Sequence, residues 1–216
     1  MGVFIAILRR RQPRNRFESE IKSANAVNML LGMGVKTIGY FTYFDRDSNE
    51  KEYYRDGGAF VTHFGEKTNV YNIMQNILVQ NQKMAPTLLS FEYQTSAVYM
   101  GAEPKYNLQY IRNCIQSTTY KKVTSVAVDK ESALISELYD KTNNRYMYMI
   151  QNIVDPMYTG APSYQTTTLT FNEKYEYALV LCEGEQTVVK LAQNEVAQYS
   201  VTQHPGKAVY VIPFNV

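Results

Sequence analysis

The stretch "GVKTIGYFTYFDRD", residues 34–47, decides the expected fold of the first part of the chain. It begins with a short apolar run, which is typical of a strand buried on both faces. It ends in aromatic residues followed by Asp45 and Asp47. In barrel and open α/β folds, ligand-contacting groups lie at the carboxyl ends of strands. The stretch therefore predicts a buried strand over Val35–Tyr43, with a candidate site at its end.

The flanking residues predict a repeated strand and helix pattern. Val3–Leu8 is a second short apolar run, and Phe17–Leu31 carries apolar residues at three- and four-residue spacings. Gly32 and Gly34 follow this helix, where a left-handed C-terminal cap is easiest. A second helix, capped by Thr68 or Asn69, is expected to run to about Met84 and to stop at Pro86. The order predicts two parallel βα units over residues 1–90.

From residue 91 onward the pattern changes to two-residue alternation interrupted by turn residues. Strand candidates alternate with turn sequences such as "DKTNN", "EGEQ" and "HPGK", and the candidates are "RYMYMIQNIVD", "TTTLTF", "KYEYALVLC", "QTVVKL" and "KAVYVIPF". Short strands at this spacing predict an antiparallel β-sandwich over residues 91–216. The predicted fold class is α+β, and we expect the sandwich to form a core of its own. Because no flexible linker marks the boundary, we also expect the two parts to pack on each other.

Composition and charge exclude some classes of partner. With 216 residues, 45% of them hydrophobic, the chain can bury a sizeable core. Lys plus Arg number 22 against 20 for Asp plus Glu, so no general attraction to nucleic acid or to an anionic membrane is expected. The sequence has no recognisable signal peptide or membrane span, which predicts a cytoplasmic location. Cys114 and Cys182 are interpreted as ordinary thiols, with Cys182 in the core.

Several polar features invite a functional interpretation, but the solvated alternative is favoured for each. Five arginines between Arg9 and Arg16 could bind a polyanion, yet they fit a loop between a strand and a helix. Asp45, Asp47 and Glu50 could include an acid and a base, yet they follow the strand in a highly polar segment that predicts a solvated turn.

No cofactor or metal site is expected from the sequence. His63 and His204 are the two histidines, and each lies beside a predicted turn, away from any readable metal-ligand spacing. No nucleophile-elbow pattern organises a serine, a histidine and an aspartate. We therefore assign no catalytic residue from these patterns.

Three segments carry a resemblance to a known family. "NAVNMLLGMGVKTIGYFTYF" (residues 25–44) resembles the last helix and strand of the barrel in β-galactosidase-type glycoside hydrolases. "GGAFVTHFGEKTNVYNIMQNILVQ" (57–80) is similar to the segment that leads into the final barrel helix. The stretch from residue 176 to residue 214 looks like the closing β-sandwich domain of those enzymes. The resemblance implies that this chain corresponds to the C-terminal part of a longer enzyme.

The same resemblance makes catalysis by this chain alone unexpected. A closed barrel needs about 200 residues or more, so most of it would be missing and the chain would be truncated relative to the enzyme. Such hydrolases use two carboxylates, which the family supplies from its fourth and seventh barrel strands. The fourth strand has no counterpart here, and the run corresponding to the seventh ends in "ILRRRQ", without an acid. The position that often holds Trp is Phe44, so the resemblance leaves Tyr43, Phe44 and Asp45 as candidate sugar contacts.

The expected function is therefore a non-catalytic, structural or carbohydrate-associated role. Two alternatives stay open: an active glycosidase completed by another chain, and a carbohydrate-binding or assembly module centred on the sandwich. Unpaired edges of the first two strands also predict a homodimer or a missing N-terminal barrel partner. Under that hypothesis, a charge at Ile5 or Ile38 would disturb assembly.

Overall fold

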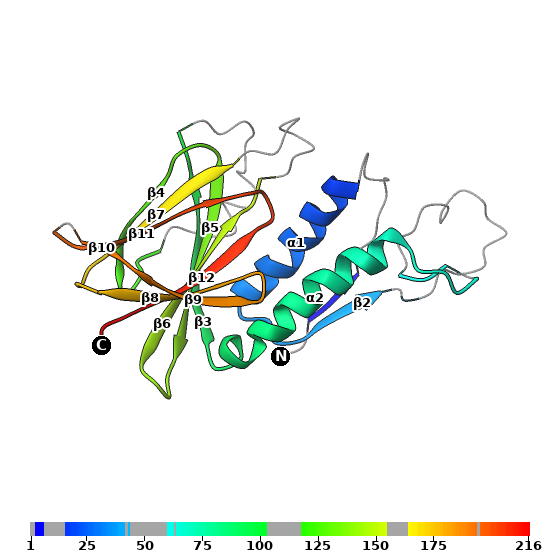
Figure 1. Cartoon of the computed structure of the whole chain (residues 1–216), viewed down its shortest axis with the longest axis horizontal. Helices are drawn as coiled ribbons and strands as arrows, with labels where there is room; N and C mark the ends of the chain where they lie inside the picture. Colours follow the sequence, from blue (N-terminus) through cyan, green and yellow to red (C-terminus); the bar gives the residue numbers. More distant parts are fainter. Residues whose placement is uncertain are drawn as a thin grey trace.

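The computed structural model describes residues 3–6, 16–41, 43, 60–62, 64–102, 118–154, 164–193 and 195–216. Figure 1 shows two helices lying side by side next to a strand-rich body that holds the C-terminus. In chain order the elements are β1 (Val3–Ala6), α1 (Arg16–Gly32), β2 (Ile38–Phe41), α2 (Asn69–Leu88), β3 (Glu92–Met100), β4 (Val123–Val128), β5 (Ser132–Asp140), β6 (Arg145–Asn152), β7 (Gln165–Phe171), β8 (Tyr177–Cys182), β9 (Glu185–Lys190), β10 (Ala192–Gln193), β11 (Ala197–Gln203) and β12 (Ala208–Phe214).

The first part of the chain contains a parallel pair of strands joined through α1. β1 and β2 pair in register from Val3 opposite Ile38 to Ala6 opposite Phe41. Ile38 and Tyr40 pack into a small core with α1 and α2, which includes the buried side chains of Val27 and Ile73. The order strand, helix, strand, helix is therefore as the sequence predicts. Among the described residues this sheet has two strands, whereas a closed barrel has eight.

The second part is a sandwich of two antiparallel sheets, as the alternating sequence predicts. One sheet has four strands in the order β10-β11-β7-β4, and the other has six in the order β3-β5-β6-β12-β8-β9. Between them lies a core that includes Ile135, Tyr148, Leu169, Phe171 and Val209. In β7, buried residues alternate with half-buried ones, as expected of a sheet with one face on the core.

The six-stranded sheet is covered on its outer face as well. Met84 and Leu88 of α2 pack against Leu138, Met149 and Tyr210, which point away from the sandwich core. As a result, β6 is buried at each position from Met147 to Asn152, without the alternation of a half-exposed strand. The helices therefore form a third layer on the sandwich, and the expectation that the two parts pack on each other is confirmed.

A glycine in the left-handed conformation terminates α1. Gly34 has φ of +77°, and the N–H groups of Gly34 and Val35 donate to the carbonyls of Leu31 and Leu30 at 2.9 and 3.0 Å. This is the Schellman pattern of helix termination, which needs a residue in the left-handed region. The predicted glycine cap is confirmed at Gly34, whereas Gly32 is the last residue of α1 itself.

Two boundaries differ from the prediction, and contacts between residues far apart in the chain lie at both of them. The strand expected over Val35–Tyr43 spans only Ile38–Phe41. In the segment before it, the Lys36 ammonium group donates to the carbonyls of Leu88 and Phe91, at the end of α2. The Lys36 side chain therefore caps the C-terminal end of α2, and β2 begins two residues later.

The prediction that α2 stops at Pro86 is wrong, because the helix continues to Leu88. Pro86 lies in the last turn, where the missing N–H removes one helical bond. Burial of Leu88 against the six-stranded sheet and the Lys36 hydrogen bond to its carbonyl stabilise this last turn. The predicted start is confirmed, since the Thr68 side chain accepts a hydrogen bond from the Tyr71 N–H at 3.4 Å.

Polar contacts also fix α1 to the sandwich. Gln151 of β6 donates from Nε2 to the carbonyl and Oδ1 of Asn25, at 3.1 and 3.0 Å. Asn28 donates from Nδ2 to the carbonyl of Gly206, at 2.9 Å. Such directional bonds fix the position of the helix on the sheet more narrowly than apolar contact alone.

Three further expectations can be compared with the structure. Ile38 packs toward the helices, so a charge there would disturb the fold before it disturbed any assembly. Cys182 is only half-buried against the sandwich core, and burial raises the pKa of its thiol, whereas Cys114 lies outside the described residues. Among the described residues, no helix combines the length and apolarity needed to cross a membrane.

Candidate functional site

The carboxyl end of β2 holds the part of the predicted sugar site that the structure describes. Tyr43 follows this strand, and its side chain is 52% exposed. Its ring lies edge-on to Phe60 with 6.1 Å between ring centroids, and its carbonyl accepts a hydrogen bond from the Val61 N–H at 2.9 Å. An exposed aromatic ring held by its backbone in this way can stack on an apolar sugar face.

Tyr40 lies within β2, three residues before Tyr43, and packs against the small core of α1 and α2. Its ring centroid is 5.7 Å from that of Phe60. Burial raises the pKa of Tyr40 to about 12, and its hydroxyl is buried without a hydrogen-bond partner among the described residues. The rings of Tyr40, Phe60 and Tyr43 therefore form one aromatic cluster. Tyr40 is its buried member, and Tyr43 is an exposed one.

The remaining predicted residues of this site cannot be compared with the structure. Phe44 and Asp45 lie outside the described residues, as do Asp47 and Glu50. Their assignment as sugar contacts or solvated turn residues stays a prediction.

Two buried carboxylates in the sandwich serve as structural acceptors. Asp140 accepts hydrogen bonds from the N–H groups of Thr142 and Asn143 and pairs with the Arg145 guanidinium at 2.8 Å. These contacts, the Arg145 bond foremost, lower the pKa of Asp140 to about 2. Glu137 accepts hydrogen bonds from the Tyr148 hydroxyl and the Lys121 N–H at 2.9 and 2.7 Å. Neither carboxylate is placed for general acid catalysis, because its partners hold it inside the fold.

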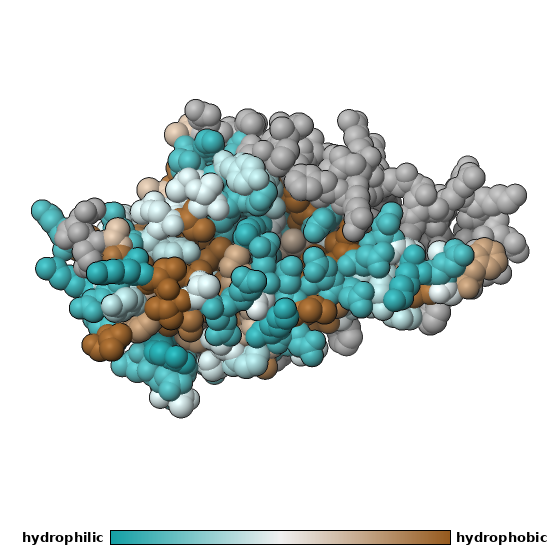
Figure 2. Space-filling view, in the orientation of Figure 1, coloured by the Kyte–Doolittle hydropathy of each residue, from teal (hydrophilic) through white to brown (hydrophobic). Residues whose placement is uncertain are grey.

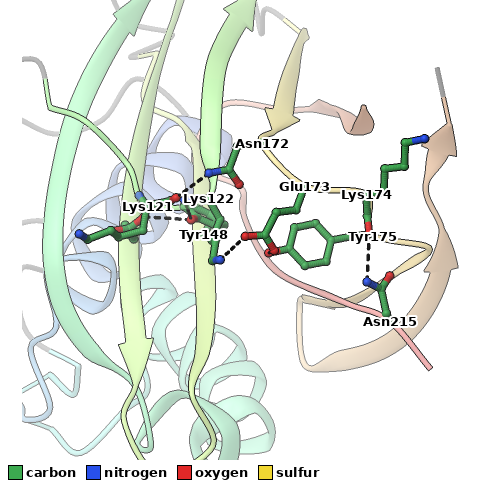
Figure 3. Close-up of polar contacts among 9 residues, drawn as sticks. Lys121, Lys122, Tyr148, Asn172, Glu173, Lys174, Tyr175 and Asn215 are labelled. Atoms are coloured by element: carbon green, nitrogen blue, oxygen red, sulfur yellow. Dashed lines mark hydrogen bonds and ion pairs between the residues drawn. The ribbon is translucent and has the colours of Figure 1, made fainter. Parts of the chain in front are cut away.

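Figure 3 shows a third carboxylate, Glu173, in a polar cluster at the edge of the sandwich. Lys122 forms an ion pair with Glu173, and the Tyr175 hydroxyl donates to the same carboxylate at 2.9 Å. Both contacts lower the pKa of Glu173, the lysine first. Asn172 and Asn215 donate from Nδ2 to the carbonyls of Lys121 and Lys174. The cluster ties the β7–β8 connection and the C-terminal segment to the sheets, which is a structural role.

The histidines do not form a metal or nucleophile site in the part of the chain that the structure describes. The His204 ring lies against Tyr164 with 4.1 Å between ring centroids, and His63 is outside the described residues. Among the described residues, no three histidine, cysteine or carboxylate side chains lie together in a way that could hold a metal ion.

Two cavities between the helices and the sandwich were missed by the sequence analysis. One, of about 220 Å³, has an apolar lining that includes Leu31, Leu78 and Leu138. The other, of about 200 Å³ and called the polar cavity below, is lined by polar and apolar residues of α1 and α2 and by the turn before β12. Asn81 lines both cavities. The feature of the sequence that could have indicated the cavities is Asn81 itself, a polar residue within the apolar stripe of α2.

Comparison with known proteins gives this site no further identity. The sequence matches no known family, and no curated protein matches it.

Proposed function

We propose that the chain represents the C-terminal part of a β-galactosidase-type barrel glycoside hydrolase, or a homologue of it, with a structural role and no catalysis of its own. The observation that carries the proposal is the parallel pairing of β1 and β2 through α1, followed by α2 and directly by a β-sandwich. This order is the one that the resemblance implies for the last barrel strands and the closing domain. Packing of both helices on the six-stranded sheet supports the role of the sandwich as a platform for barrel elements.

The carboxylates argue for the absence of catalysis by the isolated chain. Glycoside hydrolysis of this type needs two carboxyl groups roughly 5 to 9.5 Å apart, with one of them able to donate a proton. Glu137 and Asp140 are occupied by structural hydrogen bonds. The residues left for sugar contact are Tyr43, which is exposed, and the proposed neighbours Phe44 and Asp45.

A panel of aryl glycosides tests this proposal. We expect the purified chain to release no more phenolate than buffer does. Turnover that copurifies with the chain and disappears on Asp45→Asn or Asp47→Asn would overturn the assignment. The Asp140→Asn variant is the matched control, because it changes an aspartate with a structural position far along the chain.

A second candidate, an active glycosidase completed by another chain, is favoured by one specific observation. In the described residues, the sheet of β1 and β2 has two strands, so each strand has one edge without a neighbouring strand. Open edges favour pairing with further strands. The partner would be an N-terminal barrel region or a second copy of the chain, which is the predicted homodimer.

Light scattering over a range of concentrations distinguishes these partners. A concentration-dependent dimer supports self-association, whereas a monomer that gains glycosidase activity with a separately produced barrel region supports completion by another chain. A monomer that neither associates nor gains activity would leave only the structural role.

A further inference from the structure

The polar cavity lies where the two helices meet two turns of the sandwich. It has a volume of about 200 Å³, and its walls include Glu183 of the β8–β9 turn and the segment from His204 to Lys207 before β12. At roughly 30 Å³ for each water molecule, this space corresponds to about six waters. Pockets for drug-sized ligands span about 300 to 1,000 Å³. The cavity is therefore sized for one small molecule.

Part of the cavity lining is apolar and comes from the facing sides of the helices. Ile21 and Ala24 of α1 line it together with Ile77 and Met84 of α2. Ile21, Ile77 and Met84 are buried in the fold. A ligand here can place a hydrocarbon face on these side chains, which removes apolar surface from water.

Asn81 supplies a donor that the fold leaves unused. The buried side chains of α2 recur at Ile73, Ile77, Met84 and Leu88, and Asn81 occupies the same stripe at the spacing where an apolar residue is expected. Its Nδ2 atom is buried and makes no hydrogen bond within the described part of the chain. A buried donor without an acceptor costs free energy. An oxygen atom of a molecule in the cavity would supply the missing acceptor.

The remaining polar groups favour a neutral ligand over an anion. Lys207 is paired with Glu183, with 2.9 Å between Nζ and Oε2, so its charge is compensated. Gln80 and Asn76 add neutral amides to the lining. Amide groups both donate and accept hydrogen bonds, which matches the hydroxyl groups of a polyol.

We propose that this cavity binds a neutral sugar of monosaccharide size, with a hydroxyl oxygen accepting a hydrogen bond from Asn81 Nδ2. The cavity and the unpaired Asn81 donor are features of the structure that do not depend on a relationship to glycoside hydrolases. The choice of sugars among neutral polyols rests on the proposed function. The site is separate from the aromatic residues that follow β2, because its polar lining comes from the helices and the sandwich turns.

The test is a titration of the full chain, labelled with ¹⁵N, with D-galactose, D-glucose and L-arabinose, and with sodium phosphate as the anionic probe. We expect at least one sugar to shift the Asn81 side-chain amide resonances saturably, and phosphate to leave them unchanged. The Asn81→Leu variant removes the donor at similar volume and should weaken sugar binding about tenfold. Its melting temperature should stay the same or rise, because the uncompensated buried donor is gone. The control is Asn72→Leu at an exposed position of α2, which should leave binding unchanged.

The outcomes separate this proposal from the proposed function. Absence of a saturable shift with all three sugars would overturn the site, as would equal affinity in the Asn81→Leu variant or tighter binding of phosphate. If that variant does not fold, the wild-type titration alone decides, through the resonances that shift. Sugar binding at this cavity without any glycosidase relationship would leave the inference intact and remove only the proposed hydrolase origin.

Discussion

Tyr148 of β6 donates its hydroxyl hydrogen bond to Glu137 of β5, at 2.9 Å between oxygen atoms, inside the sandwich. The same hydroxyl accepts a hydrogen bond from the Lys122 N–H at 3.0 Å. Burial, together with the Glu137 carboxylate, raises the pKa of Tyr148 above its ordinary value, so the phenol stays protonated and remains a donor. This hydrogen bond reduces the free-energy cost of burying the Glu137 carboxylate, because the Tyr148 hydroxyl supplies a donor in place of water.

The first prediction is that Tyr148→Phe destabilises the chain by about 1 to 3 kcal/mol, since it removes one hydrogen-bond partner from the half-buried Lys122 N–H and one from the buried Glu137 carboxylate. Urea unfolding followed by circular dichroism measures the change. Tyr139→Phe is the matched control, because the Tyr139 hydroxyl bonds to Asn144 at an exposed site. We expect the control to change stability by less than about 0.5 kcal/mol. Equal effects of the two variants would contradict the structural role of the Glu137 pair.

The second prediction concerns acid stability and Asp140. Its pKa is lowered from 3.8 to about 2 in the folded chain, chiefly by Arg145 and then by Asn143. The unfolded chain therefore binds more protons between these values, and the stabilisation is present above pH 3.8 and lost as the pH falls through about 2.

Urea midpoints measured from pH 5 to about pH 2 should therefore fall less steeply in Asp140→Asn than in the wild type. Arg145→Met removes the largest cause of the lowered pKa and should flatten the profile in the same way. A profile of unchanged steepness in both variants would assign the acid sensitivity to other carboxylates.

Much of the architecture follows from patterns that the sequence carries locally. The alternating residues of β7 and the glycine after α1 each determine structure within a few residues of themselves. The strand and the helix cap are therefore both predicted correctly. β6 could be predicted as a strand, but its sequence did not reveal that side chains from Met147 to Asn152 are buried on both faces of the sheet. The cover of the outer face is supplied by Met84 and Leu88, more than 50 residues earlier in the chain.

The errors have the same origin in distant contacts. Lys36, just before β2, donates from its side chain to the carbonyl of Leu88, and this contact helps to stabilise the helical turn beyond Pro86. The cavity at Asn81 depends on two turns of the sandwich, which no spacing within α2 reveals. By contrast, the position of Tyr43 just after a strand follows from a local signal, and its role as a sugar contact stays a prediction.

The third prediction concerns Gly34, just after α1, and separates the steric cost of a Cβ atom from the cost of a left-handed backbone. A Cβ atom on Gly34 would lie 2.5 Å from the Cβ of Tyr93 in β3, and the residue has φ of +77°. Gly65 has φ of +85°, but a Cβ there would meet nothing within 4 Å. Gly34→Ala should therefore lower stability by more than Gly65→Ala, which carries only the backbone cost of about 1 to 2 kcal/mol. Thermal unfolding of the two variants measures the difference, and equal losses would show that α1 can move away from β3.

The last prediction is that the helices and the sandwich unfold together. The sequence alone favours a sandwich that survives without residues 1–90, but the structure leads to the opposite expectation. Removing those residues would expose the outer face of the six-stranded sheet, where Leu138, Met149 and Tyr210 are at most 2% exposed. Each such side chain contributes about 1.5 to 3 kcal/mol through its burial. Several of them together approach the whole stability of an ordinary domain, about 5 to 15 kcal/mol.

We therefore expect the fragment of residues 91–216 to aggregate or to bind a hydrophobic dye, and the full chain to unfold in one transition. Helix content from circular dichroism and tyrosine fluorescence should report the same midpoint, because the helix layer and the six-stranded sheet bury apolar side chains against each other. The variant Met149→Ala tests the contact directly, since it should lower both midpoints together and reduce the free energy of unfolding by about 2 to 5 kcal/mol. Val188→Ala on β9, where the side chain is 61% exposed, is the matched control and should change neither midpoint appreciably. A soluble, protease-resistant fragment beginning near Phe91 would show instead that the sandwich is stable without its helix layer.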